Sequence, residues 1–280
     1  MSDLKSLGAH YEFGENWASF SNTIDEQSLQ HAEQGILALA NKDELAARTF
    51  LDIGCGSGIH SAAAGRLGVK SVLSTDIDPK CIATPARMLE RFAGGVSWKT
   101  ENVSVFDISP QGRGTFDVVY SWGVLHHTGA MYEAIERAAA MVGPGGLFVF
   151  ALYRRTSAVM DRLWTLEKRW YTRATPIAKK RADATYNSLM KMRYLLAGRS
   201  HRQSVATYKS QRGNSYAHDI SDWLGGYPYE VIAPQEVETL MTSLGFEHVR
   251  SIVKPRSIGL FGSGCDQYTY RRKTSPVASP

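Results

Sequence analysis

Between residues 49 and 152, short runs of β-branched and aromatic residues alternate with stretches of helical periodicity. The strand-like runs are TFLDI, SVLSTD, VSWKT, FDVVYS and LFVFALY, and the helical stretches begin after Gly58, at Pro79 and near Gly129. Alternation of this kind is typical of a parallel sheet whose strands are joined by crossover helices. Because the strand-like runs are continuously apolar, helices should cover both faces of the sheet.

Helical and strand-like patterns continue on both sides of this region. An aromatic cluster, HYEFGENWASF, precedes an amphipathic pattern at residues 24–40, and residues 156–198 have the pattern of two amphipathic helices interrupted by Pro176. The segment HDISDWLGGYPYEV should be an ordered, aromatic-rich loop, because Gly-Gly and Pro interrupt it. Pro234 should begin another helix, and FEHVRSIV and CDQYTYRR should be the last two strands.

The composition fits an ordinary globular chain. Of the 280 residues, 43% are hydrophobic and 21% are charged, which excludes a disordered, collagen-like or coiled-coil chain. The longest apolar run is about half the ~20 residues of a membrane-spanning helix, and the N-terminus lacks the apolar core of a signal peptide. Cys55, Cys81 and Cys265 form no CxxC pair, so we expect neither disulfides nor a bound metal. These features predict a cytoplasmic protein.

Three glycines lie directly after the first expected strand. Gly54, Gly56 and Gly58 follow Asp52, at the point where the strand gives way to a helix. Glycines permit a tight turn there and let backbone N–H groups approach a ligand at the positive end of the helix. Eighteen residues beyond Gly58, the next strand ends at Asp76, whose carboxylate can accept both hydroxyls of a ribose. Together these residues predict an adenosine-type ligand.

The glycine spacing separates two classes of adenosine ligand. Dinucleotide folds use G-x-G-x-x-G, whereas this chain has G-x-G-x-G preceded by an acid. Asp52 would repel a pyrophosphate, but it can pair with the ammonium of an amino acid, directly or through water. Adenosine joined to an amino acid is S-adenosylmethionine (SAM). A nicotinamide-dependent oxidoreductase is therefore the disfavoured alternative.

On these residues the chain resembles the class I SAM-dependent methyltransferases, in particular the small-molecule group that includes the ubiquinone and menaquinone methylases. LDIGCGSG resembles the first motif of the family, FDVVYSWGVLHH its fourth-strand motif, and VGPGGLFVF its loop into the fifth strand. The resemblance covers residues 49–153 and implies that Asp52, Gly54, Gly56 and Gly58 surround the methionine end of SAM. The product would be S-adenosylhomocysteine (SAH).

The resemblance also implies contacts with the rest of SAM. Asp76 would bind the ribose, with Ile77 against the adenine, and Ser121 would lie beside the reactive centre. NVSVFD occupies the place of the adenine-edge loop of the family but lacks its usual Gly-Asp pair. Ser104 and Val105 are the expected contacts there.

Two aromatic residues of the N-terminal segment could close over the cofactor. Tyr11 and Trp17 would attract the sulfonium through their π-faces and exclude water. The alternative is a hydrophobic cluster that only anchors the N-terminus.

Methyl transfer to a hydroxyl requires in-line alignment and removal of the hydroxyl proton. His126 and His127 follow the fourth expected strand at the carboxyl edge of the sheet, where such sheets bind ligands. His218 lies beside Asp219 and Asp222 in the aromatic-rich segment. Each of the three histidines is a candidate base, and the alternative for His126 and His127 is a purely structural role in their loop.

Positive charge is concentrated in one segment. Residues 154–212 contain 15 Lys and Arg and three acids, whereas the rest of the chain has 17 bases and 24 acids. This segment could be a solvated helical face, a clamp for an anionic acceptor, or a surface that meets membrane phospholipid. Trp164, Trp170 and Tyr171 interleave with its basic residues, which favours an interfacial helix that carries a lipid-linked or phosphorylated substrate.

We therefore expect one Rossmann-like α/β fold, with a seven-stranded, mostly parallel sheet sandwiched by helices and a helical insert between strands five and six. The chain should divide into an N-terminal aromatic segment and helix at 1–48, a SAM-binding core at 49–153, a basic helical insert or lid at 154–213, an acceptor loop with the C-terminal strands at 214–273, and a flexible tail at 274–280.

The expected function is SAM-dependent methylation of a small molecule, at a hydroxyl of a sugar, lipid-linked or quinol-type substrate. Methylation of nucleic acid or protein is one alternative, and a non-catalytic SAM-binding module is another. Nucleic acid is disfavoured because the fourth-strand motif, Tyr-Ser-Trp-Gly, lacks the Pro-Pro-aromatic with which amino-methylating DNA enzymes stack a flipped base.

Overall fold

The centre of the computed structural model is one seven-stranded sheet with the order β3-β2-β1-β4-β5-β7-β6. The strands are β1 Thr49–Ile53, β2 Ser71–Asp76, β3 Ser97–Asn102, β4 Phe116–Trp122, β5 Val142–Tyr153, β6 Phe246–Ile252 and β7 Cys265–Arg272. Strands β1 to β5 are parallel, and β7 runs antiparallel to both β5 and β6. The predicted seven-stranded, mostly parallel sheet is therefore confirmed.

The structure describes part of the chain. The described residues are 11, 17, 21, 23–206, 216–255, 257–260, 262 and 264–274, without the side chains of residues 206 and 217–219. Most of the predicted N-terminal aromatic segment, the predicted tail beyond residue 274 and the side chain of His218 lie outside this description.

Helices cover both faces of the sheet and enclose two apolar cores. On one face α2 Glu26–Leu37, α4 Ile59–Arg66 and α5 Ala83–Phe92 bury residues such as Ile36, Ala63 and Leu89. On the other face α7 Met131–Ala140 and α13 Pro234–Ser243 bury Ile135 and Met241. Four short elements complete this part: α3 Lys42–Leu45, α6 Pro110–Arg113 and the 3-10 turns Pro79–Cys81 and Leu125–His127.

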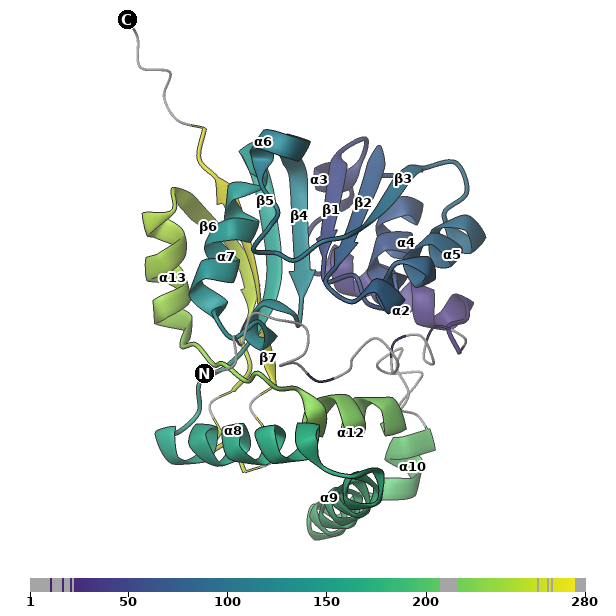
Figure 1. The fold of residues 1–280 in the computed structure, drawn as a ribbon, viewed down its shortest axis with the longest axis vertical. Helices are drawn as coiled ribbons and strands as arrows, with labels where there is room; N and C mark the ends of the chain where they lie inside the picture. The colour runs from purple at the N-terminus through teal and green to yellow at the C-terminus, as the bar shows by residue number, and fades with distance from the viewer. Residues whose placement is uncertain are drawn as a thin grey trace, which may run out of the picture.

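The predicted helical insert between strands five and six is confirmed. It contains α8 Ala158–Arg173, α9 Pro176–Leu196 and α10 His201–Ala206, and Pro176 is the first residue of α9. The Thr175 side chain caps α9 by accepting a hydrogen bond from the N–H of Ala178. In Figure 1 these helices lie beyond the end of the sheet toward which the β4 arrow points, that is, at the carboxyl ends of the parallel strands.

One expectation about local structure is wrong. The start of HDISDWLGGYPYEV is not a loop but belongs to α12 Tyr216–Gly225, which packs on α8. Ile220 and Leu224 are one turn apart and both bury against Tyr171 of α8, so an apolar helical face exists ahead of the glycines. The helix ends at Gly225, where a Cβ would lie 2.4 Å from the Tyr11 ring.

Candidate functional site

The loop after β1 is a tight turn that requires glycine. Gly54 and Gly58 have φ of +74° and +79°, a conformation that favours glycine. A Cβ at Gly54 would lie 2.5 Å from the Val124 side chain, and a Cβ at Gly58 would lie 2.4 Å from Cα of Pro85. Both glycines are therefore required for space as well as for conformation.

Asp76 at the end of β2 is hydrogen bonded to this loop. Its Oδ2 accepts from the N–H of Gly56 at 3.0 Å, and its Oδ1 accepts from the N–H of Asp78 at 2.9 Å. Burial raises the pKa of Asp76 to about 6, and the Asp78 charge acts in the same direction. The carboxylate is thus held in place beside the turn, next to the Trp17 ring, which lies 3.3 Å from the position of a Cβ at Gly56.

Asp52 is a second carboxylate in the same site. It is 3% exposed, and its Oδ2 accepts from the Ser61 hydroxyl at 2.6 Å. Burial raises the pKa of Asp52 to about 7, and the neighbouring charge of Asp76 raises it further. A cation arriving at this loop would stabilise the ionised form of both carboxylates, so the site favours a positively charged ligand.

The other predicted cofactor contacts are distributed around the loop. Ser121 is fully buried, and its hydroxyl donates to the carbonyl of Ile53 at 3.1 Å, which joins β4 to β1. Ser104 accepts from a backbone N–H through its hydroxyl, whereas Val105 is 8% exposed and packs in the core beneath α7. Ile77 is half-buried directly after β2.

Asn102 is a site residue that the sequence analysis missed. Its Nδ2 donates to the carbonyl oxygens of Asp76 and Ile77, each at 2.9 Å, and so holds the backbone after β2. The signal that could have found it is its place as the last residue of β3, at the same carboxyl edge as Asp76.

The two N-terminal aromatic residues lie in different surroundings. Trp17 lies against the glycine loop at Gly56, as described above. Tyr11 instead donates its backbone N–H to the carbonyl of Tyr227 at 3.0 Å, and its ring centroid lies 6.3 Å from that of Tyr171. The structure therefore brings Trp17, but not the Tyr11 ring, onto the predicted donor loop.

His126 and His127 are both buried after β4. The His126 ring centroid lies 4.0 Å from that of Tyr153, and its Nδ1 accepts from the N–H of Tyr153 at 3.3 Å. Burial, followed by the nearby His127 and Lys168, lowers the pKa of His126 well below its usual range. His127 donates from Nδ1 to the carbonyl of Pro228 at 2.6 Å. His218 belongs to α12, and its side chain is outside the described residues.

The family model for the methyltransferase domain matches residues 24–203. The chain belongs to this family. The match includes the glycine loop, Asp76 and most of the insert, and it confirms the predicted class I SAM-dependent methyltransferase.

Curated relatives of this methyltransferase carry the name ubiquinone biosynthesis O-methyltransferase. The Xanthomonas euvesicatoria protein is 33% identical over 115 residues, which are 41% of this chain and 47% of the relative. The Rhizobium etli protein is 34% identical over 128 residues, which are 45% of this chain and 50% of the relative. The chain thus spans about half the length of the curated relatives it matches.

A solved structure shares the fold of the methyltransferase. Magnesium protoporphyrin IX methyltransferase from Synechocystis, determined with bound SAM, is 12% identical with a TM-score of 0.51. The superposition covers 88% of this chain and 80% of the other chain. At this identity the likeness extends to the fold alone.

The site of this methyltransferase fits SAM on its own geometry. SAM carries positive charge on its sulfonium and its ammonium, and the loop offers the buried carboxylate of Asp52 and the half-buried carboxylate of Asp76. At Gly56 the turn lies between the Asp76 carboxylate, which accepts its N–H, and the Trp17 ring, which occupies the side where a Cβ would point. The strand order reverses between β1 and β4, the place where open α/β sheets bind their ligands.

Proposed function

We propose that this protein transfers the methyl group of SAM to a hydroxyl oxygen of a small molecule, releasing SAH. The observation that carries the proposal is the hydrogen bond from Gly56 to Asp76, with Asp52 buried beside it. This arrangement suits a cationic adenosyl ligand. The names of the relatives, which are O-methyltransferases of ubiquinone biosynthesis, support a hydroxyl acceptor of the quinol type, and sugars or lipid-linked sugars share that acceptor group.

The donor-binding roles are part of this proposal. The proposed cofactor contacts are Asp52, Gly54, Gly56, Gly58, Asp76, Ile77, Ser104, Val105, Ser121 and Trp17, whereas the Tyr11 ring lies near Tyr171 of α8 and is not among them. Asp52 would pair with the ammonium and Asp76 would accept the ribose hydroxyls, because each carboxylate already lies at the loop that the ligand must approach. When bound, SAM supplies the electrophilic methyl group, and the protein aligns the acceptor oxygen with it and excludes water.

The proton of the hydroxyl acceptor requires a base, and His218, His126 and His127 are the proposed candidates. His126 already uses the Nδ1 lone pair to accept from Tyr153, so a basic role would require its other tautomer. The Nδ1–H of His127 donates a hydrogen bond to the carbonyl oxygen of Pro228, so Nε2 is the basic atom of this imidazole. His218 lies in α12, the helix that follows the insert.

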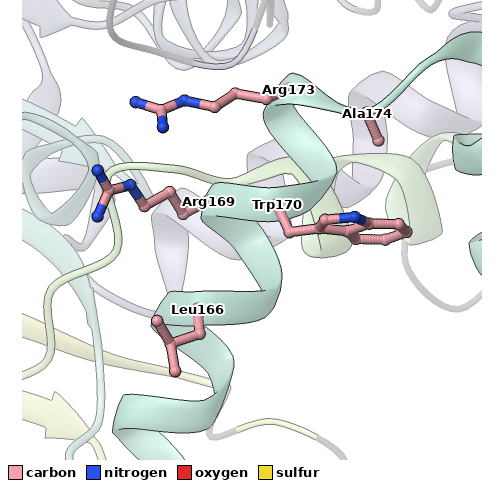
Figure 2. A pocket seen from close by; sticks show the side chains of 5 residues that line it. All are labelled: Leu166, Arg169, Trp170, Arg173 and Ala174. Carbon is pink, nitrogen blue, oxygen red and sulfur yellow. The ribbon is translucent and has the colours of Figure 1, made fainter.

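The proposed division of the chain is a donor site in residues 49–153 and an acceptor side formed by the basic insert, residues 154–213, with residues 214–273. Arg169, Arg173, Leu166 and Trp170 line a cavity of about 350 Å³ along α8, and Figure 2 shows both arginines extending from the same side of the helix. This mixture of positive charge and exposed apolar side chains favours an anionic or lipid-linked acceptor, delivered from a phospholipid surface.

Contact with a membrane would be peripheral. Among the described residues, none of the helices has the length and apolarity to cross a bilayer. On α8 and α9, Leu166, Trp170 and Ile177 are 56%, 52% and 68% exposed, so they can enter the interface between headgroups and acyl chains. We place this activity in the cytoplasm, because the three cysteines are widely spaced and form no CxxC pair, as expected in a reducing compartment.

A transfer assay with methyl-labelled SAM tests the proposed function. The purified protein is incubated with quinols, hydroxylated sugars and lipid-linked sugars, and both labelled product and SAH are measured. We expect SAH to form in equal amount to an O-methylated product with at least one of these acceptors. Binding of SAM without turnover on the whole panel would favour the non-catalytic binding module instead.

A further inference from the structure

A groove between α8, α9 and α12 is a second cavity of the insert, and the proposed function gives it no role. Its volume is about 650 Å³. Its lining is mostly apolar and includes Trp164, Trp170, Ile177, Tyr186, Leu189 and Leu224. We call this cavity the insert groove.

The insert groove is long and narrow. Its wall on α9 extends from Ile177 to Leu189, which is about 18 Å because an α-helix rises about 1.5 Å per residue. Dividing the volume by this length gives a mean cross-section of about 36 Å², whereas an α-helix of about 10–12 Å diameter has a cross-section of about 80–110 Å². The groove therefore fits an extended chain and is too narrow for a helix of a protein partner.

One end of the groove lies at the surface that we propose to meet the membrane. Trp170 lines both the groove and the cavity of Arg169 and Arg173, and in Figure 2 its indole points away from the two arginines. Ile177, on the α9 wall, is 68% exposed at the same surface. An apolar chain that leaves a bilayer can enter the groove here without crossing bulk water.

One carboxylate oxygen in the groove lacks a hydrogen-bond donor. Glu167 is a lining residue, and its Oε2 is buried without a partner among the residues that the structure describes. A buried oxygen of this kind costs free energy, which a donor on a ligand would recover. Arg181 also lines the groove, and the insert has a large excess of basic residues, so a cationic donor is repelled. An uncharged hydroxyl is the donor that fits.

We propose that the insert groove binds a lipid with one linear apolar chain, and that a hydroxyl of this lipid donates a hydrogen bond to Glu167. The inference rests on the proposed function and deepens it, because it gives the chain of a lipid-linked acceptor its own binding site. Glu167 belongs to the insert and not to the donor loop, so the hydroxyl that it holds is not the one that is methylated.

The test uses 1-decanol as the probe, because it has one linear chain and one hydroxyl. Its binding to the full chain is measured by titration calorimetry and by tryptophan emission, which moves to shorter wavelength when water leaves an indole. Because Trp170 lines the groove and is 52% exposed, we expect saturable binding with such a shift. 1-Butanol should bind at least tenfold more weakly, since it buries fewer methylene groups.

The deciding variant is Ala178→Phe, which fills the groove from its α9 wall. Ala184→Phe makes the same change at an exposed position of α9 outside the groove and is the matched control. We expect Ala178→Phe to weaken 1-decanol binding tenfold or more and Ala184→Phe to leave it unchanged. Glu167→Leu should also weaken binding about tenfold or more, because the hydroxyl loses its acceptor. This second variant should fold, since it removes a buried oxygen that has no donor.

Binding of SAH is measured separately on each protein, so that its absence in the wild type would refute the proposed function alone. The groove proposal is overturned if 1-decanol does not bind saturably, or if it binds equally to the wild type and to Ala178→Phe. Unchanged binding in Glu167→Leu would overturn the role of this carboxylate. Displacement of 1-decanol by dihexanoylphosphatidylglycerol, which has two short chains, would assign the groove to membrane phospholipid instead.

Discussion

The backbone N–H of Gly56 donates a 3.0 Å hydrogen bond to the Oδ2 of Asp76, which joins the loop after β1 to the end of β2. Because the second oxygen of Asp76 accepts from Asp78, the carboxylate has a single orientation before any ligand arrives. A preorganised acceptor at this position lowers the entropic cost of binding the ribose hydroxyls. The predictions below follow from this arrangement and from the helices that cover the same edge of the sheet.

Replacing Asp76 with Ala should weaken SAM binding by tenfold or more, about 1.4 kcal/mol, because the ribose hydroxyls lose their acceptor. Titration calorimetry with SAM measures the change. Asp43→Ala, at an exposed position of α3, is the control and should bind SAM like the wild type. Equal affinity in Asp76→Ala would remove Asp76 from the donor site.

The stability of the ligand-free protein should fall as the pH rises from 5 to 8. The pKa of Asp52 is raised to about 7 in the folded state, whereas an unfolded aspartate titrates near 4, so the folded state binds more protons across this window. In Asp52→Asn the loss of unfolding free energy between pH 5 and pH 8 should be smaller than in the wild type, by on the order of 1 to 4 kcal/mol. Urea unfolding at several pH values measures it, with Asp107→Asn as the control. An unchanged pH dependence in Asp52→Asn would contradict the raised pKa.

Two glycine substitutions should separate steric from conformational effects. Gly58→Ala would combine a positive φ with a Cβ 2.4 Å from the Pro85 backbone, so we expect a loss of about 3 kcal/mol or more. Gly68→Ala also has a positive φ, but no atom lies within 4 Å of its Cβ, so about 1 to 2 kcal/mol is expected. Urea unfolding compares the two; equal losses would mean that the helix after the loop shifts to make room.

The exposed face of α8 should bind anionic membranes. We expect the protein to sediment with vesicles of phosphatidylglycerol and phosphatidylcholine but not with phosphatidylcholine alone. The double change Arg169→Glu with Trp170→Ser should lower binding about tenfold or more, since each basic residue near such a surface contributes about 1 kcal/mol. Arg137→Glu, in α7, is the charge-matched control. Binding that the double change leaves intact would show that this face does not meet the membrane.

Much of the fold could be predicted because its signals are local. Gly54, Gly56 and Gly58 stand where the turn needs them, and the runs that form β1, β2, β4 and β5 are mostly buried, whereas β3 at the edge of the sheet has no buried residue. The sequence analysis missed α12 because Gly225, Gly226 and Pro228 indicate a turn, and these residues lie at the end of the helix and directly after it. Its helical face, Ile220 and Leu224, becomes evident only when the partner Tyr171 is known.

The donor site was more predictable than the acceptor side. The hydrogen bond between Gly56 and Asp76 joins residues 20 positions apart that belong to neighbouring strand ends of one motif. The aromatic rings around the Lys168 Nζ instead come from a strand end, an insert helix and the segment from Trp223 to Tyr229: they are Tyr153, Trp164, Trp223 and Tyr229. In sequence, Lys168 is one of many basic residues of an amphipathic stretch, and only tertiary packing shows that it is buried.

Thermal unfolding with SAM, SAH, NAD or NADP tests the central claim most directly, because a ligand at about 100 times its dissociation constant adds about 2.7 kcal/mol of stability. We predict that the two adenosyl compounds raise the melting temperature and that the nicotinamide cofactors leave it unchanged. Stabilisation by NAD or NADP alone, or by none of the four compounds, would contradict the assignment of the glycine loop and Asp76 to SAM.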